Sequence, residues 1–211
     1  MSTGVTVIDY GMGNLLSVCR ALEHVGTEVT LSSDPDVIMQ ATRLVLPGVG
    51  AFGDGMKELG RRGLIEPIRK RASDNTPLLG ICLGAQMLLD SGEEFGHHQG
   101  LGLIHGEVRT IPITNTSGQP LKVPHVGWSD LHVDKSHPLL ETLPPESAVY
   151  FVHSFQCLPQ DKQDLIGHCD LGGHAITAMI SHGQITGCQF HPEKSGPVGL
   201  HILRNFLEQR A

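Results

Sequence analysis

The sequence predicts an α/β fold built on a doubly wound open sheet, with a more antiparallel extension in the second half of the chain. Up to residue 91, short β-branched segments alternate with segments of helical spacing, which is the pattern of a parallel sheet with crossover helices. After Gly92, strand-like segments follow one another with little helix between them, which indicates antiparallel pairing. The chain has 211 residues, of which 39% are hydrophobic, enough to bury one sizeable core. We therefore expect a single domain over residues 1–211.

The first half contains four predicted strands, each a short apolar segment: residues 4–9, 28–33, 43–47 and 76–82. Helical spacing of apolar residues, or a helix start signal, follows each of them: residues 14–26, 34–41, 53–71 and 83–91. Gly26 ends the first helix, and Asp34 with Pro35 is a typical start for the second. Gly63 is expected to divide the third helical segment in two.

The second half contains six further strand candidates, which cover residues 102–112, 128–133, 148–155, 165–169, 175–181 and 184–190. Residues 195–209 then form a predicted helix with one apolar face. Neither a linker nor an internal repeat interrupts the chain, which agrees with one domain.

The charge balance argues against a nucleic-acid binder, because the net charge is −7 and the sequence pI is about 6.0. The two basic clusters, residues 57–62 and 69–71, lie at helical spacing beside Glu58 and Glu66, so we interpret them as solvated helix faces.

The cysteine pattern favours reduced thiols, since five cysteines are widely spaced and form no CxxC pair. The first residues lack the features of a signal peptide, and no apolar run approaches the roughly 18 residues of a membrane helix. We expect a soluble, cytoplasmic protein.

The segment GICLGAQ, residues 80–86, predicts a reactive cysteine. A strand that ends at Cys82 and a helix that starts after it form a strand–turn–helix corner, similar to a nucleophile elbow with cysteine in place of serine. Small residues at Gly80 and Gly84 let the turn close tightly, and the helix N-terminus favours the thiolate. The N–H of Leu83 is then a candidate oxyanion donor. Taken alone, a cysteine in an apolar run is also typical of an inert core residue.

The segment GCQFHPEKSG, residues 187–196, predicts the partner of that cysteine. Pro192 favours an extended conformation at His191, and in an extended chain residues two apart point the same way. Glu193 can therefore orient the imidazole, which serves as base and then as acid for a cysteine nucleophile. The alternative is a surface loop, but Cys82 and His191 together are more specific than either alone.

Two further stretches admit more than one interpretation. Gly48, Gly50 and Gly53 form a GxGxxG after the third strand, which we interpret as a flexible turn facing Cys82, not as a dinucleotide site. His125 and His153 lie beside aromatic residues. Metal binding is the alternative to ordinary core or surface histidines, but no HxH, HExxH or paired Cys/His spacing occurs.

Taken together, GICLGAQ and HPE resemble the signature pair of the class I glutamine amidotransferases. The segments DYGMGNL, LPGVGAF, PHVGW, YFVHSF and QFHPEKSG are similar to those of the members that serve as glutaminase subunits of imidazole glycerol phosphate synthase in histidine biosynthesis. The resemblance runs from residue 9 to the last helix. It implies a flavodoxin-like sheet and no cofactor or metal.

The resemblance also implies roles for single residues. Cys82 is the implied nucleophile, and His191, oriented by Glu193, is the implied acid and base. Leu83 and, after a peptide flip, Val49 supply the implied oxyanion hole. The residues implied to bind glutamine are Gly50, Gln86, Glu94, Ser154 and Phe155.

The implied partner is a (β/α)₈-barrel cyclase subunit that forms a heterodimer with the glutaminase. Ammonia from glutamine passes to this partner, which makes imidazole glycerol phosphate and aminoimidazole carboxamide ribotide from a phosphoribulosyl formimino carboxamide ribotide. Nothing in the present sequence resembles a site for such a bis-phosphorylated ribotide. The resemblance places the docking face near residues 47–50 and 124–128, with Pro47–Gly50 as the switch.

Three positions depart from the family pattern: Phe155 stands where tyrosine is usual, Ser129 where asparagine is usual, and Ala85 where methionine is common. The change at 129, near the expected interface, leaves open a paralogous subunit that feeds another acceptor such as a bacterial surface sugar. Two further hypotheses are a stand-alone hydrolase of γ-glutamyl compounds and a non-catalytic binding module on the same fold.

Overall fold

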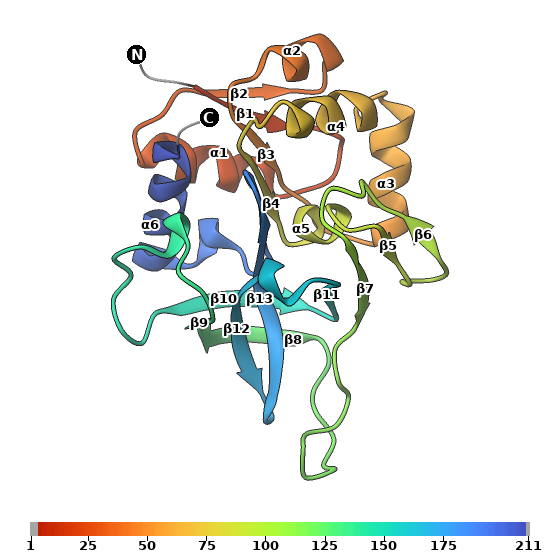
Figure 1. Cartoon of the computed structure of the whole chain (residues 1–211), viewed down its shortest axis with the longest axis vertical. Coiled ribbons are helices and arrows are strands. Elements are labelled where there is room, and N and C mark those ends of the chain that lie inside the picture. The colour runs from red at the N-terminus through yellow and green to blue at the C-terminus, as the bar shows by residue number, and fades with distance from the viewer. Residues whose placement is uncertain (1–3, 210–211) are drawn as a thin grey trace.

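The computed structural model describes residues 4–209, and one large mixed sheet forms its centre (Figure 1). Residues 1–3 and 210–211, the ends of the predicted domain, lie outside the described residues. The strands of this sheet are β1 (Val5–Ile8), β2 (Val29–Ser32), β3 (Leu44–Leu46), β4 (Leu78–Ile81), β9 (His132–Val133), β12 (Leu165–Leu171), β13 (His174–His182) and β14 (Ile185–Cys188). They lie side by side in the order β2-β1-β3-β4-β14-β13-β12-β9.

The two halves of this sheet differ in strand direction, as the sequence predicts. Strands β2, β1, β3, β4 and β14 are parallel to one another, whereas β13, β12 and β9 continue the sheet from β14 in antiparallel pairs. The parallel part has the strand order of flavodoxin-like folds. The doubly wound sheet with a more antiparallel extension is therefore confirmed.

Helices cover both faces of the parallel part (Figure 1). They are α1 (Leu15–His24), α2 (Pro35–Gln40), α3 (Phe52–Arg61), α4 (Ile65–Ser73), α5 (Leu83–Met87) and α6 (Gly196–Glu208). Side chains of α1 and α6 share one core cluster with Val7 of β1, and those of α2–α5 share a second cluster with Ile8. Neighbouring residues of a strand point to opposite faces, so β1 contributes to both layers.

Local signals place the start of α2 and the break between α3 and α4 where the sequence predicts them. The Asp34 carboxylate accepts a hydrogen bond from the N–H of Asp36 at 2.9 Å, which caps α2. Gly63 has φ +68° and separates α3 from α4, which confirms the predicted break.

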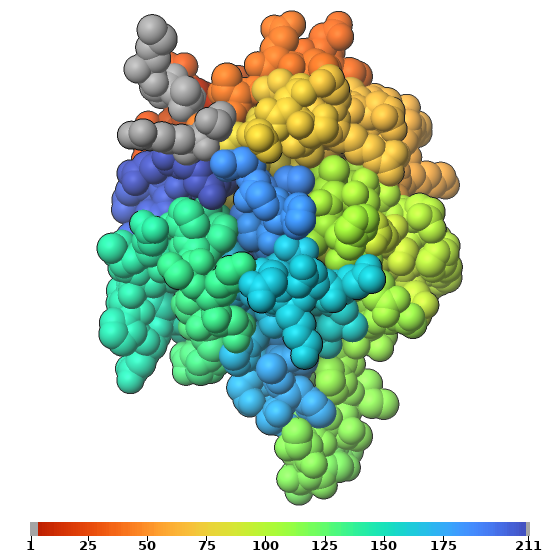
Figure 2. Space-filling model, viewed as in Figure 1, coloured from red at the N-terminus to blue at the C-terminus, as the bar shows by residue number. Residues whose placement is uncertain are grey.

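The remaining strands form two small sheets beside the large one. An antiparallel ribbon pairs β8 (His125–Asp130) with β10 (Ala148–His153). The other sheet has the order β11-β7-β5-β6 and consists of β5 (Ser91–Gly92), β6 (His98–Gln99), β7 (Gly106–Thr110) and β11 (Phe155–Pro159). Three short 3₁₀ helices complete the fold: η1 (Pro138–Leu140), η2 (Lys162–Asp164) and η3 (Pro192–Lys194). The segment between β7 and β8 projects from the bottom of the molecule (Figure 2).

The predicted helix 83–91 is wrong at its C-terminal end, because α5 ends at Met87. Segment 100–104 supplies the reason, because its amides take the carbonyls that end the helix. The N–H of Leu101 donates to the Met87 carbonyl at 2.8 Å, and that of Leu103 donates to the Leu88 carbonyl at 2.8 Å. The chain then enters β5, which carries no apolar alternation in its sequence.

Two predicted strands are each divided between two sheets. The predicted strand 148–155 breaks at Ser154, because β10 pairs with β8 whereas β11 pairs with β7. The predicted strand 128–133 is likewise divided between β8 and β9. Apolar periodicity does not identify the partner of a strand, so it cannot show where the partner changes.

A search of the described part of the chain, residues 4–209, finds no helix with the length and apolarity needed to cross a membrane.

The contact of α5 with β3 leaves no room for a side chain at Gly84. A Cβ there would lie 1.8 Å from the Leu46 carbonyl oxygen. We expect Gly84→Ala to destabilise the fold by roughly 1–3 kcal/mol or more, because α5 or β3 must shift. Urea unfolding measures this free energy.

The matched control is Gly60→Ala in α3, where a new Cβ would meet only Ile65 Cδ1, at 3.6 Å. This variant should be neutral or more stable by up to about 1 kcal/mol, the helix-propensity difference. Equal unfolding free energies for the two variants would contradict the packing account.

Candidate active site

Cys82 stands on a sharp turn between β4 and α5. Its backbone angles, φ 53° and ψ −110°, lie outside the regions that side-chain-bearing residues ordinarily occupy, so the turn is strained. Its N–H donates to the Cys188 carbonyl at 2.8 Å, after which the chain enters α5. The structure therefore has the strand–turn–helix corner that the sequence predicts.

His191 lies beside this turn because β14 is the parallel neighbour of β4, with Cys188 opposite Ile81. The carboxyl ends of both strands therefore meet at one edge of the sheet, where sites of such folds occur. The backbone of His191 is held on both sides: its N–H donates to the Tyr150 carbonyl at 2.9 Å, and its carbonyl accepts from Ser195 Oγ at 2.7 Å.

Glu193 orients the imidazole of His191. The distance from His191 Nδ1 to Glu193 Oε1 is 2.8 Å, and the two side chains are 2% and 1% exposed. Nδ1 therefore carries a proton, and Nε2 is the atom left for other chemistry. Within the described residues Nε2 has no hydrogen-bond partner.

The charges around His191 favour its protonated form. Burial lowers its pKa, but interactions with Cys82 and with the Glu193 carboxylate outweigh burial and raise the pKa to about 9. The contribution of Glu193 follows directly from the geometry, because its Oε1 lies 2.8 Å from His191 Nδ1. An imidazolium beside a thiolate is the arrangement that activates a cysteine nucleophile.

A cavity of about 530 Å³ opens in front of Cys82. Its lining residues come from the loop after β3, the elbow, the segment after β5 and the junction of β10 and β11. All of the predicted site residues except Glu193 line this cavity, and Glu193 lies behind His191. The lining residues that the sequence predicts are Val49, Gly50, Cys82, Leu83, Gln86, Glu94, Ser154, Phe155 and His191. The structure thus brings the predicted residues to one place, while their individual roles stay predictions.

The glycine-rich loop after β3 rests directly on the elbow. A Cβ on Gly48 would lie 2.9 Å from Leu83 Cβ and 3.0 Å from the Gly84 nitrogen, so only glycine permits this approach. Gly50 has φ +112°, and Val49 is 40% exposed. The loop lines the cavity of Cys82, as expected for a turn that faces the cysteine.

Two of the predicted glutamine ligands already make internal hydrogen bonds. Glu94 Oε2 accepts from the N–H of Phe52 at 2.8 Å, which ties it to the start of α3. Gln86 Nε2 donates to Gln189 Oε1 at 3.0 Å and to the Phe155 carbonyl at 3.3 Å. Both side chains are therefore held in the cavity wall before any ligand enters.

Other residues of the cavity were not predicted from the sequence to lie there. His153 and Phe95 line it, and Gln189 Nε2 lies 3.8 Å from Cys82 Sγ in hydrogen-bonding geometry. A signal for Gln189 was available, because it precedes His191 by two residues and shares its side of the extended chain. Phe95, which is 92% exposed, gives no periodic signal.

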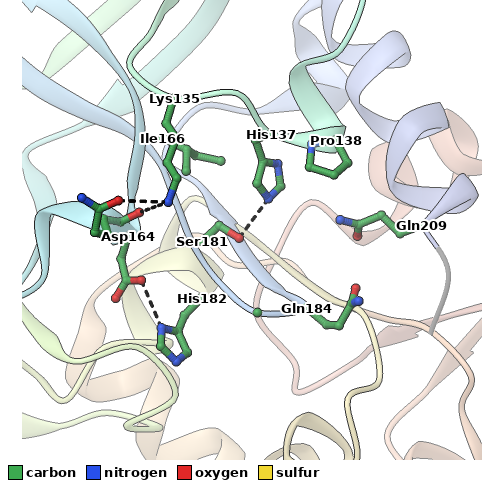
Figure 3. A pocket seen from close by; sticks show the side chains of 11 residues that line it. Lys135, His137, Pro138, Asp164, Ile166, Ser181, His182, Gln184 and Gln209 are labelled. Carbon is green, nitrogen blue, oxygen red and sulfur yellow. Dashed lines mark hydrogen bonds and ion pairs between the residues drawn. The ribbon is translucent and has the colours of Figure 1, made fainter.

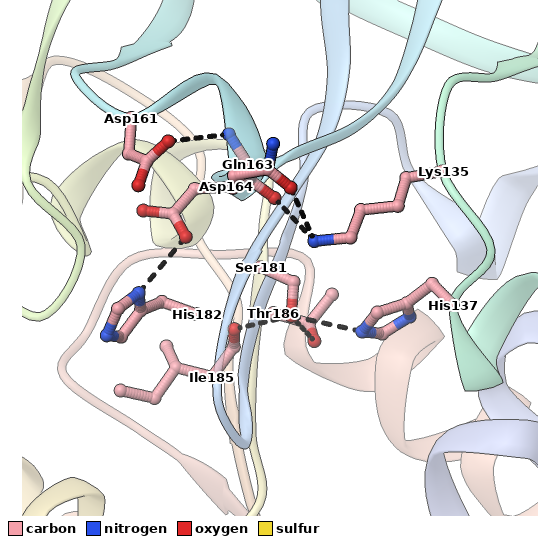
Figure 4. Close-up of polar contacts among 9 residues, drawn as sticks. All are labelled: Lys135, His137, Asp161, Gln163, Asp164, Ser181, His182, Ile185 and Thr186. Atoms are coloured by element: carbon pink, nitrogen blue, oxygen red, sulfur yellow. Dashed lines mark hydrogen bonds and ion pairs between the residues drawn. The ribbon is translucent and has the colours of Figure 1, made fainter.

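A second cavity, of about 320 Å³, contains a histidine–serine pair but not a nucleophile (Figure 3). His137 Nε2 lies 3.0 Å from Ser181 Oγ. The N–H of Leu139 donates to His137 Nδ1 at 3.3 Å, so the proton of the neutral ring is on Nε2 and His137 donates to the serine. The serine in turn donates to the Ile185 carbonyl at 3.1 Å (Figure 4). A histidine that donates to the hydroxyl cannot act as its base.

The other ionisable groups add no further centre. All five cysteines are free, and burial raises the pKa of the Cys157, Cys169 and Cys188 thiols. Among the described residues, no group of three or more His, Cys, Asp or Glu side chains is arranged to hold a metal ion.

Comparisons with known proteins agree with this geometry. A model of the family "Glutamine amidotransferase class-I" matches residues 6–210. The chain is 49% identical to imidazole glycerol phosphate synthase subunit HisH 1 of Legionella pneumophila (strain Lens), over 98% of this chain and 99% of that protein. It is 51% identical to subunit HisH of Streptococcus sanguinis (strain SK36), over 96% of this chain and 94% of that protein.

A solved structure also has this fold. A crystal structure of a glutamine amidotransferase superposes with a TM-score of 0.74 at 22% identity and covers 97% of each chain. At this identity the likeness concerns the fold alone.

The contact of His191 with Glu193 leads to a direct test. We expect Glu193→Gln to lower the pKa of His191 below about 9, because an amide does not stabilise the imidazolium as a carboxylate does. An NMR pH titration of the His191 ring measures this pKa. As a control, Glu66→Gln removes an exposed carboxylate of α4 and should leave the titration unchanged. An unaltered pKa in Glu193→Gln would contradict the electrostatic account.

Proposed function

Since the chain belongs to the class I glutamine amidotransferase family, we propose that it is the glutaminase subunit of an imidazole glycerol phosphate synthase. In this proposal the whole chain is one glutaminase domain that releases ammonia from glutamine in the cytoplasm and delivers it to a cyclase subunit. The subunit names of relatives 49% and 51% identical over nearly their whole length support this acceptor over a surface sugar.

The observation that carries the proposal is the arrangement of Cys82, His191 and Glu193 at the end of one cavity. The nucleophile candidate stands on a strained turn, and the imidazole beside it is fixed by a buried carboxylate at 2.8 Å. This geometry fits hydrolysis of a carboxamide, since the reaction needs a thiolate, a proton for the leaving amine and a base for water.

The first half-reaction breaks the C–N bond of the glutamine side chain. The Cys82 thiolate attacks the carboxamide carbon and forms a tetrahedral adduct. As the adduct collapses, His191 gives its Nε2 proton to the nitrogen, ammonia leaves, and a γ-glutamyl thioester remains. His191 is then neutral and serves as base for the second half-reaction. Water adds to the thioester, its proton returns to His191, and glutamate leaves with the thiolate restored.

The negative oxygen of the adduct needs hydrogen-bond donors at its position. Leu83 is the first residue of α5, and an N–H in the first turn has no partner within the helix. Val49 is the second proposed donor, after a flip of the loop that contains Gly50. The positive φ of Gly50 and the glycine at position 48 support a loop with two accessible conformations.

The acceptor of ammonia is proposed to sit on a (β/α)₈-barrel partner. An apolar surface near the cavity supports a docking face there. Val126, Trp128 and Val152 are 53%, 57% and 36% exposed, and they point outward from the β8–β10 ribbon next to Tyr150. Aromatic and aliphatic side chains that stay exposed in this way are typical of a protein interface.

Glutamate release from glutamine tests the proposed function. We expect little release by the chain alone and strong stimulation when a histidine-pathway cyclase subunit and its ribotide ligand are both added. Full activity of the chain alone would instead identify a free-standing hydrolase. No glutamate release under either condition would mean a different partner and acceptor.

Replacement of the nucleophile should remove this activity. We expect Cys82→Ser to lower glutamate release at least about a thousandfold, because a hydroxyl is a far weaker nucleophile than a thiolate. Cys19→Ser, which changes a cysteine of α1 outside the cavity, is the matched control and should keep its activity. Thermal unfolding shows whether both variants are folded. Substantial turnover by folded Cys82→Ser would disprove the nucleophile assignment.

The loop after β3 should govern stimulation by the partner. Proline fixes φ near −65° and removes the N–H, whereas Gly50 has φ +112°. We expect Gly50→Pro to lower the partner-dependent stimulation by roughly 5–150-fold, the usual range of coupling between sites. Stimulation is the ratio of glutamate release with and without the partner. An unchanged ratio would remove this loop from the mechanism.

A further inference from the structure

Two buried histidines that the proposed mechanism does not use lie against each other at the wall of the cavity. His125 of β8 and His153 of β10 are opposite each other in the ribbon, and they are 7% and 5% exposed. The distance between His125 Nδ1 and His153 Nε2 is 3.0 Å. The His125 ring stacks on Phe151, with 5.0 Å between ring centroids.

Burial keeps both rings neutral near pH 7. It lowers the pKa of His125, and it lowers that of His153 to about 4, against a smaller raising effect of the Phe155 carbonyl. A neutral imidazole has one donor and one acceptor nitrogen. The direction of each hydrogen bond in the pair is therefore fixed by the groups at its two ends.

The hydrogen bonds run in one direction from Ser129 to Phe155. The Phe155 carbonyl can only accept, so His153 donates to it from Nδ1, at 2.7 Å. His153 Nε2 is then an acceptor and receives the Nδ1 proton of His125.

The proton position on His125 follows in the same way. His125 Nε2 accepts in turn, and the hydroxyl of Ser129 donates to it at 3.0 Å. Each proton position follows from the previous one, and loss of the Ser129 hydroxyl would leave His125 Nε2, the last acceptor of the series, without this donor.

The series continues to the nucleophile. The Phe155 carbonyl also accepts from Gln86 Nε2 at 3.3 Å, and Gln86 Nε2 donates to Gln189 Oε1 at 3.0 Å. Gln189 Nε2 is 3.8 Å from Cys82 Sγ. A continuous path of hydrogen bonds therefore links Ser129 to Cys82 through the wall of the cavity.

The Ser129 end of this path belongs to the ribbon that carries the proposed docking face. Along β8, His125, Gly127 and Ser129 are the less exposed positions, and the residues between them are exposed. The histidine pair and the outward apolar side chains thus occupy opposite sides of one two-stranded ribbon. Ser129, His125 and His153 all belong to this ribbon, whereas Phe155 belongs to β11 of another sheet. A movement of the ribbon relative to β11 on docking would therefore change the contact between His153 and the Phe155 carbonyl.

We propose that Ser129, His125 and His153 are positioning residues that hold the Phe155 carbonyl and Gln86 in place beside Cys82 and transmit docking on the β8–β10 ribbon to the nucleophile. The transmission rests on the proposed function, because that function assigns the docking face. The positioning does not, since it concerns the isolated chain alone.

The proton positions can be measured on the isolated chain. Long-range ¹H–¹⁵N NMR distinguishes the two neutral forms of a histidine ring. We expect both His125 and His153 to carry their proton on Nδ1. A proton on Nε2 of either ring would reverse a hydrogen bond in the series and overturn the proposal.

Kinetics of the assembled enzyme test the transmission. We expect Ser129→Ala to lower the ratio of stimulated to unstimulated kcat by about fivefold, the effect of one lost hydrogen bond, with a smaller change in KM for glutamine. Ser129→Thr keeps a hydroxyl and should keep the ratio. Ser136→Ala is the matched control, because Ser136 is exposed between β9 and η1, and it should behave as the unaltered chain.

The outcomes separate this inference from the proposed function. If the unaltered chain is stimulated and Ser129→Ala is stimulated equally, transmission through Ser129 is wrong while the function stands. If the unaltered chain is not stimulated at all, the proposed function fails together with the transmission, and the NMR measurement alone decides the positioning role.

Discussion

The parallel pairing of β4 with β14 is the interaction on which the rest of the site depends. It places Cys82 and His191 at the same edge of the sheet, with the N–H of Cys82 bonded to the Cys188 carbonyl at 2.8 Å. Side chains alternate between the two faces of a strand, so a slip of one residue would turn the imidazole away from the thiol. The two strands are more than a hundred residues apart in the sequence, and the folded core between them holds this register.

Close backbone packing around α5 supports the same geometry. A Cβ on Gly80 would lie 2.8 Å from the backbone of Ala85, and a Cβ on Gly187 would lie 2.9 Å from Ala85 Cβ. Together with Gly84 and Gly48, these residues let the elbow, two strands and the glycine-rich loop approach one another. The strained angles of Cys82 persist because the surrounding elements leave the chain no alternative path.

The sequence was sufficient for local features and for chemistry that depends on a short motif. The strand ending at Cys82, the break at Gly63 and the contact of His191 with Glu193 all follow from neighbours in the chain. Three features did not follow from it. The early end of α5 depends on amides of segment 100–104, the break at Ser154 depends on a change of partner strand, and the His125–His153 contact requires the register of two distant strands. Periodicity and spacing describe one segment at a time and contain no information on such partners.

The central claim is that Cys82, and no other cysteine, is the nucleophile that attacks glutamine. The most direct measurement is peptide mass spectrometry of the chain after reaction with a glutamine analogue that carries an electrophile in place of the side-chain amide. The account predicts a single modified residue, Cys82, together with loss of glutamate release. Modification of a different cysteine, or loss of activity without any label on Cys82, would contradict it.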